Sequence, residues 1–154
     1  MEYLELTLAK HPFFQGLPEK YIKHIAGMAI ILKFDSDHIL FKAGDDADKF
    51  YLVIKGKVSI ETNAPPKGSI TIQTVEDGEI LGWSWIVAPY KYRFGAKTLV
   101  KSEIIVIDGF ELRAECKKDH WLGYELMTRM VLAVAARLEQ TRLLALDVYG
   151  QKRR

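Results

Sequence analysis

The residues best suited to chemistry in this chain are Arg93 and the turn formed by Gly82-Trp83-Ser84. A guanidinium pairs with an anion through two parallel N–H donors. A glycine turn followed by the start of a helix presents backbone N–H groups that also favour an anion. The pattern therefore predicts an anion-binding loop. The alternative is that Arg93 is a surface residue among Lys91, Tyr92 and Lys97, since most arginines are exposed.

Three aromatic side chains, Trp83, Trp85 and Phe94, lie around the same loop. Their ring faces can stack on a planar ligand or attract a cation. The same side chains can instead fill a core and close any pocket at this position. Both interpretations stay open at the level of sequence, and the second one would leave a ligand-free scaffold for protein interaction.

Short strands are predicted to position this loop. Residues 69–75 alternate between apolar and polar, with Ile70 and Ile72 on one face, and residues 50–54 alternate in the same way. Lys55-Gly56 is typical of a two-residue hairpin turn, because glycine accepts the positive φ that such turns need. Several short strands at this spacing favour a sandwich or jelly roll over a parallel sheet.

Helical periodicity follows the strands. Asp108 is a predicted N-cap, and Glu111 is placed to complete a capping box with it. A second, longer helix is predicted from about Asp119 to about Tyr149, with no proline to interrupt it. Two apolar stripes run along this helix. The first contains Met127, Met130, Val134, Thr141, Leu144 and Val148, and the second contains Val131, Ala135, Leu138 and Ala145.

A helix with two apolar faces needs two partners. The strands supply one, and the second stripe is predicted to meet its own copy in a symmetric homodimer. The alternative is a helix that sinks deeply into its own barrel. Arg137 and Arg142 interrupt the stripes, which favours a short two-helix contact over a long coiled coil.

Several segments in order resemble the cyclic-nucleotide-binding domain family. They are His11-Pro12-Phe13-Phe14 with Gly16-Leu17-Pro18, residues 34–46 with Gly44, residues 49–58 as a central hairpin, Glu79-Ile80-Leu81-Gly82, and residues 78–98 as the phosphate-binding cassette. Together they cover nearly the whole chain. The resemblance implies a mainly β fold with flanking helices: a double-stranded β-helix or jelly-roll barrel followed by a long C-terminal helix.

The resemblance also implies roles for the cassette residues. The family pattern is Gly-Glu, a short helix and then an Arg; here Gly82 keeps the turn, Trp83 stands at the Glu position and Arg93 at the Arg position. The family's Glu accepts the ribose 2′-hydroxyl hydrogen, whereas an indole has only a donor. Losing that hydrogen bond should weaken ribose binding by roughly tenfold to more than a hundredfold. Phe94 replaces a small, often hydroxylic, residue.

By the same resemblance, the long helix forms a lid that brings two more residues to the ligand. The expected ligand-binding residues are Gly82, Trp83, Ser84, Trp85, Arg93, Phe94, Thr141 and Arg142. No cofactor is expected to be required, and the possible ligand is a cyclic nucleotide or another anionic small molecule.

These features predict a binding module, a sensor or regulatory domain for an anionic or non-standard ligand. The first alternative is a true cyclic AMP or cyclic GMP receptor, and the second is the ligand-free scaffold. In transcription factors of this family the long helix leads through a hinge to a helix-turn-helix domain. Residues 146–150 resemble that hinge, and the sequence ends four residues later, so no direct DNA binding is expected and a protein partner would carry the output.

Composition agrees with one domain over residues 1–154. Its expected parts are an N-terminal helical segment (1–29), a β-barrel (30–108) with the cassette at 78–98, and C-terminal helices (109–150). The net charge of +2 gives little attraction to nucleic acid. No apolar run approaches the roughly 20 residues that span a bilayer, so no membrane association and a cytoplasmic location are expected.

Enzymatic motifs are absent from the sequence. No nucleophile-elbow, phosphate-loop or dinucleotide-binding pattern occurs, and the four histidines have no metal-ligand spacing; they are His11, His24, His38 and His120. We therefore expect no enzymatic activity and no metal. Cys116, the single cysteine, lies beside Lys117 and Lys118, whose charges would favour a lowered thiol pKa.

Overall fold

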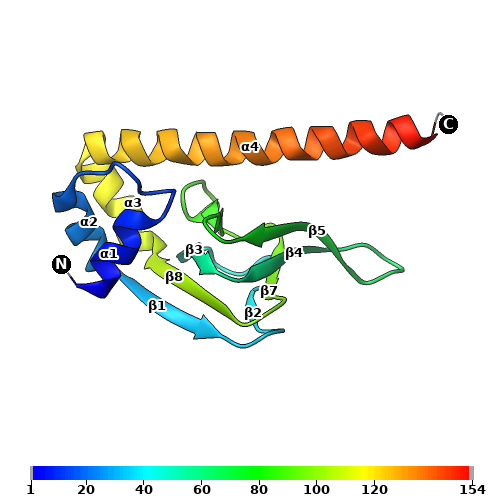
Figure 1. Cartoon of the computed structure of the whole chain (residues 1–154), viewed down its shortest axis with the longest axis horizontal. Helices are drawn as coiled ribbons and strands as arrows, with labels where there is room; N and C mark the ends of the chain where they lie inside the picture. Colours follow the sequence, from blue (N-terminus) through cyan, green and yellow to red (C-terminus); the bar gives the residue numbers. More distant parts are fainter. Residues whose placement is uncertain (1, 153–154) are drawn as a thin grey trace.

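Two four-stranded antiparallel sheets form the centre of the molecule, and helices cover one end and one side of it (Figure 1). The computed structural model describes residues 2–152, with side chains as far as residue 150. Residues 1, 153 and 154 of the expected domain lie outside the described residues. The first sheet has the order β1 (Ala29–Phe34), β8 (Ser102–Asp108), β3 (Lys49–Lys55) and β6 (Ile80–Leu81). The second has the order β2 (Ile39–Phe41), β7 (Gly95–Thr98), β4 (Lys57–Asn63) and β5 (Ser69–Glu76). The predicted jelly roll is confirmed.

Strand β3 is buried on both faces. Phe50 and Leu52 point into a core shared with the helices, while Tyr51 and Val53 point into a second core inside the barrel. The alternation predicted for residues 50–54 is present, but both of its faces are buried. Strand β3 therefore joins the helical end of the molecule to the barrel.

Two details of the predicted strands differ. Lys55-Gly56 is not a hairpin turn, because β3 and β4 belong to different sheets and the chain crosses between them at Gly56. Gly56 has φ 146°, and a Cβ there would lie 2.2 Å from Ser102 Oγ, so glycine is needed for close approach. Strand β5, an edge strand of its sheet, forms as predicted, but Ile70 and Ile72 are exposed and only Val75, near its end, is fully buried.

Four α-helices flank the sheets: α1 (Tyr3–Lys10), α2 (Glu19–Ala26), α3 (Gly109–Lys118) and α4 (His120–Lys152). The carboxylate of Asp108 accepts a hydrogen bond from the Glu111 N–H at 2.9 Å, which confirms the N-cap of α3. The reciprocal half of the capping box is absent, since the Asp108 N–H donates to the Met28 carbonyl. Helices α1, α2 and α3 pack with the first turns of α4 around Leu8, Ile22, Leu112 and Leu122.

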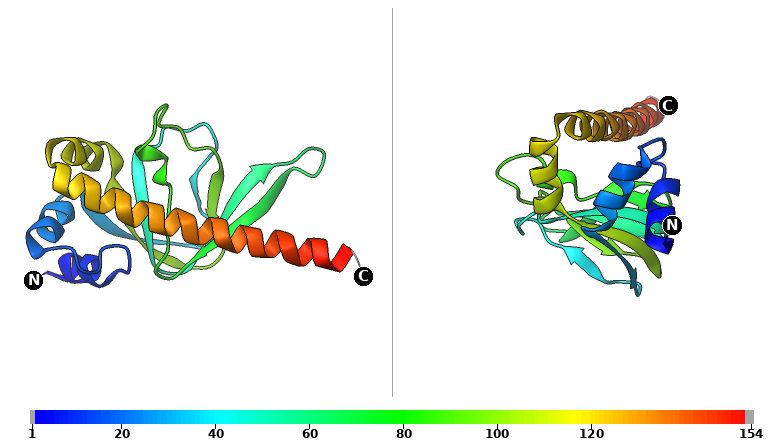
Figure 2. Two further views of the ribbon diagram at one scale, coloured as in Figure 1. Left: turned by 90° about the horizontal axis from the view of Figure 1, so that it is seen from above. Right: turned by 90° about the vertical axis from the view of Figure 1, so that its left-hand side faces the viewer.

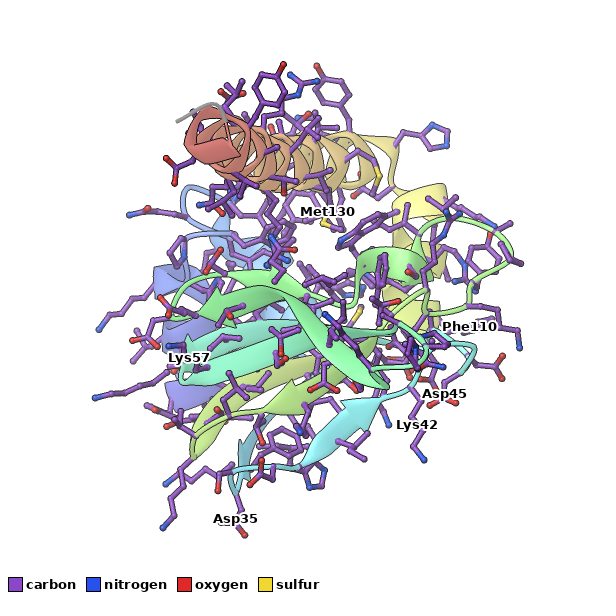
Figure 3. The ribbon with its side chains drawn as sticks, turned by 90° about the vertical axis from the view of Figure 1, so that its right-hand side faces the viewer. Asp35, Lys42, Asp45, Lys57, Phe110 and Met130 are labelled. Carbon is purple, nitrogen blue, oxygen red and sulfur yellow. The ribbon has the colours of Figure 1, made fainter. Side chains whose placement is uncertain are left out.

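Helix α4 has 33 residues and is about 50 Å long. It starts where predicted and runs along one side of the barrel, out beyond the sheets (Figures 1 and 2). Leu122, Leu126 and Met130 are buried, and Met130 points toward the barrel (Figure 3). From Val131 onward most apolar side chains of α4 are exposed. The alternative of a helix sunk into its own barrel is therefore wrong.

Candidate ligand-binding site

A cavity of about 410 Å³ lies between the barrel and α4. Strands, cassette and helix all contribute to its wall. The lining residues are Phe41, Ile60, Ile72, Gln73, Leu81, Gly82, Trp83, Ser84, Tyr92, Arg93, Phe94, Val134, Arg137, Leu138 and Thr141. Of the expected ligand-binding residues, the cavity brings together all except Trp85 and Arg142.

The cassette turn depends on Gly82. Its φ of 74° is left-handed, and a Cβ there would lie 2.9 Å from the Tyr51 Cδ2 atom, so only glycine fits without displacement. The helix implied after it is a single 3₁₀ turn, Trp83–Trp85. The turn places Trp83 and Ser84 in the wall of the cavity.

The two cassette tryptophans have different surroundings. Trp83 is 39% exposed and lines the cavity, whereas Trp85 is 1% exposed and packs in the helical core. The ring of Trp85 lies 5.5 Å from that of Phe50. Trp85 thus anchors the cassette in the core, and Trp83 is left as part of an open wall.

Arg113 on α3 holds the far side of the cassette. Its Nη1 donates to the Trp85 carbonyl at 2.5 Å, and its guanidinium stacks 3.8 Å from the centre of the Tyr90 ring. Tyr90 follows the 3₁₀ turn in a left-handed conformation, with φ 56°. Arg113 thus connects the cassette to α3 on both sides of residues 86–89.

Arg93 lies just before β7, exposed at the edge of the cavity. Lys91 pairs with Asp46, and Lys97 pairs with Glu61 at 3.6 Å. Among the described residues no carboxylate pairs with Arg93. Its charge is thus free for an anion, and Phe94 beside it adds an apolar ring to the wall.

Two aromatic rings form the floor on the barrel side. Phe41 and Tyr92 stack with ring centres 3.8 Å apart and 14° between planes. The Tyr92 hydroxyl donates to the Lys49 carbonyl at 2.6 Å, and burial raises the Tyr92 pKa. Burial, with a smaller effect of Asp48, also raises the pKa of the neighbouring Tyr51 to about 12. Tyr92 therefore serves the site as a neutral ring.

Helix α4 forms the roof of the cavity. Of its two expected ligand-binding residues, Thr141 lines the cavity and Arg142 does not. The Thr141 hydroxyl donates to the Arg137 carbonyl at 3.0 Å and has only acceptor capacity left for a ligand. Arg142 is exposed.

Arg137 is the lining residue that sequence reasoning missed as a ligand contact. Its Nη2 donates to the Ile80 carbonyl and its Nη1 donates to Gln73 Oε1 at 3.4 Å. Burial lowers the pKa of Arg137, and nearby Glu79 partly opposes that effect. The signal was in the sequence, since Arg137 interrupts an apolar stripe four residues before Thr141 and so shares its helix face.

The structure gives little support to a reactive thiol or a metal site. Cys116 is half-buried, and burial, with Glu115 and Asp119, raises its pKa to about 11, so the predicted lowering by the adjacent lysines is wrong. Within residues 2–152 no group of three or more His, Cys, Asp or Glu side chains could hold a metal ion. In the same range, no helix has the length and apolar character needed to cross a membrane.

The structure is a jelly-roll domain with a cavity between its barrel and its C-terminal helix. The chain belongs to the cyclic nucleotide-binding domain family, whose sequence model matches residues 31–119, more than half of the chain. It is 24% identical over 140 residues to the CRP-like cAMP-activated global transcriptional regulator of Mycobacterium tuberculosis, covering 90% of this chain. The chain spans 60% of the length of that relative.

Solved structures give the same fold. A Geobacter metallireducens protein named for cyclic nucleotide binding superposes with a TM-score of 0.80 at 29% identity, over 90% of this chain and 99% of that one. The regulatory domain of Toxoplasma gondii PKA, crystallised with cAMP, superposes with a TM-score of 0.62 at 17% identity, over 72% of this chain and 42% of that one. The predicted family and fold are confirmed.

Proposed function

We propose that this chain is a small-ligand sensor or regulatory module, acting by binding and not by catalysis, whose ligand is anionic and not a standard cyclic nucleotide. The observation that carries the proposal is the open cavity of about 410 Å³, with Trp83 in its wall and, at its edge, Arg93, which forms no ion pair with the described residues. A cavity of this size under a lid helix suits a small molecule.

Trp83 argues against a standard cyclic nucleotide. It stands where the family resemblance puts the Glu that holds the ribose, and it lines the cavity. An indole offers one N–H donor and no acceptor for a hydroxyl hydrogen. The site thus keeps a cation for an anionic group while losing the main contact to the sugar.

The proposed output passes through α4. Because α4 roofs the cavity, a ligand that contacts Leu138 or Thr141 favours one position of the helix over another. Beyond Met130 the helix also exposes Val131 and other apolar side chains. We infer that a second copy, and through it a protein partner, reads that shift, without DNA contacts by these residues.

Replacing Trp83 tests the assignment. Trp83→Glu restores the missing carboxylate and should raise cyclic AMP affinity by at least roughly tenfold over the unmodified chain. Trp83→Gln is the matched control, because glutamine has about the size of glutamate without its charge. This variant should gain much less cyclic AMP affinity. Affinity is measured by titration calorimetry, with circular dichroism to check folding.

The other outcomes separate the alternatives. Micromolar binding of cyclic AMP or cyclic GMP by the unmodified chain would make it a true receptor for that nucleotide; the mycobacterial relative is described as cAMP-activated. A destabilised Trp83→Glu variant without affinity would indicate that Trp83 closes the cavity, which is the scaffold reading.

A further inference from the structure

The most unusual charge in the cavity is that of Arg137. Its guanidinium is removed from much of the solvent and donates hydrogen bonds to two neutral acceptors, the Ile80 carbonyl and the Gln73 side-chain oxygen. No carboxylate in the part of the chain that the structure describes forms an ion pair with it. The Glu79 carboxylate is near enough to favour the charge of Arg137 but forms no ion pair with it. An anion that a ligand brings into direct contact with this half-buried guanidinium would therefore stabilise the charge further.

The rest of the cavity is mainly apolar. Aliphatic side chains from the barrel and from α4 face the aromatic floor and the Trp83 wall. These aliphatic residues are Ile60, Ile72, Leu81, Val134 and Leu138. Besides the two arginines, the polar side chains of the lining are Gln73, Ser84 and Thr141, together with the Trp83 indole N–H and the Tyr92 hydroxyl. The hydroxyl hydrogens of Thr141 and Tyr92 are already donated, to the Arg137 and Lys49 carbonyls. A ligand rich in hydroxyl groups would leave many of its own polar atoms unpaired here.

We propose that the cavity takes an apolar carboxylate, a flat or elongated hydrocarbon body with a single carboxylate, and that Arg137 on α4 is its ionic anchor. This inference rests on the proposed function, since it names the ligand class of the same site. The carboxylate forms two parallel hydrogen bonds with the guanidinium, in exchange for those to Ile80 and Gln73. The apolar body lies against the Phe41–Tyr92 stack and Trp83.

Arg137 suits this role better than Arg93. Arg93 is exposed, where solvent screens its charge and an ion pair contributes little. Arg137 is half-buried on the helix that forms the roof, so its pairing is less screened. Because Arg137 also holds α4 to the barrel through Ile80, a ligand that draws its guanidinium away changes how α4 is held.

The test uses a matched pair of probes, 2-naphthoate and its neutral analogue 2-naphthamide, with the full chain. Titration calorimetry and tryptophan fluorescence should show 2-naphthoate binding at least roughly tenfold more tightly than the amide. Arg137→Gln should weaken naphthoate by a similar factor and make the two probes equal. Arg137→Lys, which keeps the charge without the paired donors, should recover part of the loss.

Three controls locate the effect. Arg142→Gln should leave naphthoate affinity unchanged, because Arg142 is exposed and does not line the cavity. Arg137 also borders a second hollow of about 370 Å³, and the two spaces can be filled separately. Val134→Phe narrows only the first cavity and should abolish binding, whereas Ala136→Phe narrows only the second and should not.

The opposite pattern overturns the inference. It fails if naphthoate does not bind, if the amide binds equally well, or if Arg93→Gln or Ala136→Phe removes binding while Arg137→Gln does not. A cyclic AMP titration separates this failure from that of the proposed function. If neither cyclic AMP nor either naphthalene probe binds, the proposed ligand site as a whole is contradicted. If naphthoate binds and its binding is lost in Arg93→Gln but kept in Arg137→Gln, only the role of Arg137 as the anchor is overturned.

Discussion

At the scale of the residue, the cassette divides its aromatic side chains between two tasks. Trp85 fixes the 3₁₀ turn in the core beside Phe50, and Arg113 holds the Trp85 carbonyl from α3. With the turn held from two sides, Gly82 and Trp83 face the cavity. The site can therefore present an aromatic wall without losing the support that the turn needs.

His11 is a second residue whose surroundings have a measurable effect, here on protonation. It is buried, donates from Nε2 to the Val53 carbonyl at 3.0 Å and accepts at Nδ1 from the Phe13 N–H at 3.2 Å, so it is held neutral. Burial lowers its pKa below the usual 6.5, and the Val53 hydrogen bond opposes this only in part. The unfolded chain thus binds more protons at this site than the folded one.

The free energy of unfolding should depend on pH for this reason. The His11 contribution is fully present above pH 6.5 and is lost as pH falls from 6.5 through the lower folded pKa, with a slope of at most about 1.4 kcal/mol per pH unit. His11→Gln should flatten the slope below pH 6.5 in urea titrations. Equal slopes in His11→Gln and in the unmodified chain would show that His11 does not cause the pH dependence.

Most of the site could be predicted from sequence because its residues follow a recognisable motif. Gly82, Trp83 and Arg93 are fixed by the order of the cassette. Trp85 and Arg142 do not line the cavity as expected, and each difference has a physical reason. A 3₁₀ turn of three residues does not reveal which tryptophan enters the core. Arg142 is about 100° around the helix from Thr141, whereas Arg137 shares the face of Thr141.

At the scale of the element, α4 has two parts with different surroundings. Its first turns are buried against α1, α2 and α3 through Leu122 and Leu126. Its later turns carry exposed apolar residues such as Leu146. The first part is therefore held by this chain's own core, and the second is available for contact with another molecule.

This division predicts unequal effects of the same substitution. Leu126→Ala should lower the free energy of unfolding by about 2–5 kcal/mol, because it leaves a cavity in the core. Leu146→Ala, at a site 66% exposed, should change it by less than about 0.5 kcal/mol at concentrations where the chain is monomeric. Urea unfolding followed by circular dichroism measures both, and equal losses would show that the two parts of α4 are held alike.

The start and length of α4 could be predicted because helical periodicity is local. The course of the chain at Gly56 could not, because a Lys-Gly pair that suits a hairpin suits a crossing between sheets equally well. The close approach to Ser102 that requires glycine there is a contact distant in sequence. The same holds for β5, whose alternation is visible in sequence while its position at the sheet edge is not.

At the scale of the whole molecule, the apolar stripe on α4 supports the proposed homodimer. Tyr124, Val131, Leu138 and Ala145 recur at seven-residue steps, which is the spacing of a two-helix contact. Val131 is 66% exposed and does not line the cavity. A partner helix on this stripe would lie beside the roof of the ligand site, since Leu138 belongs to both.

Val131→Glu should therefore convert a dimer into a monomer, because it places like charges opposite each other in the contact. Analytical ultracentrifugation measures the change. Leu143→Glu is the matched control, since Leu143 is exposed but lies on another face of the helix, and it should leave the dimer intact. A monomer in the unmodified chain, or equal dissociation by both variants, would contradict the proposed dimer.

The central claim is that the cavity under α4 is a binding site for a small ligand. Its most direct test is titration calorimetry of the chain and of Val134→Phe with cyclic AMP, cyclic GMP and 2-naphthoate. We expect binding of 2-naphthoate to the chain, little or no binding of the cyclic nucleotides, and loss of the naphthoate signal in Val134→Phe. Absence of heat with all three probes, or naphthoate binding unchanged in Val134→Phe, would contradict the claim.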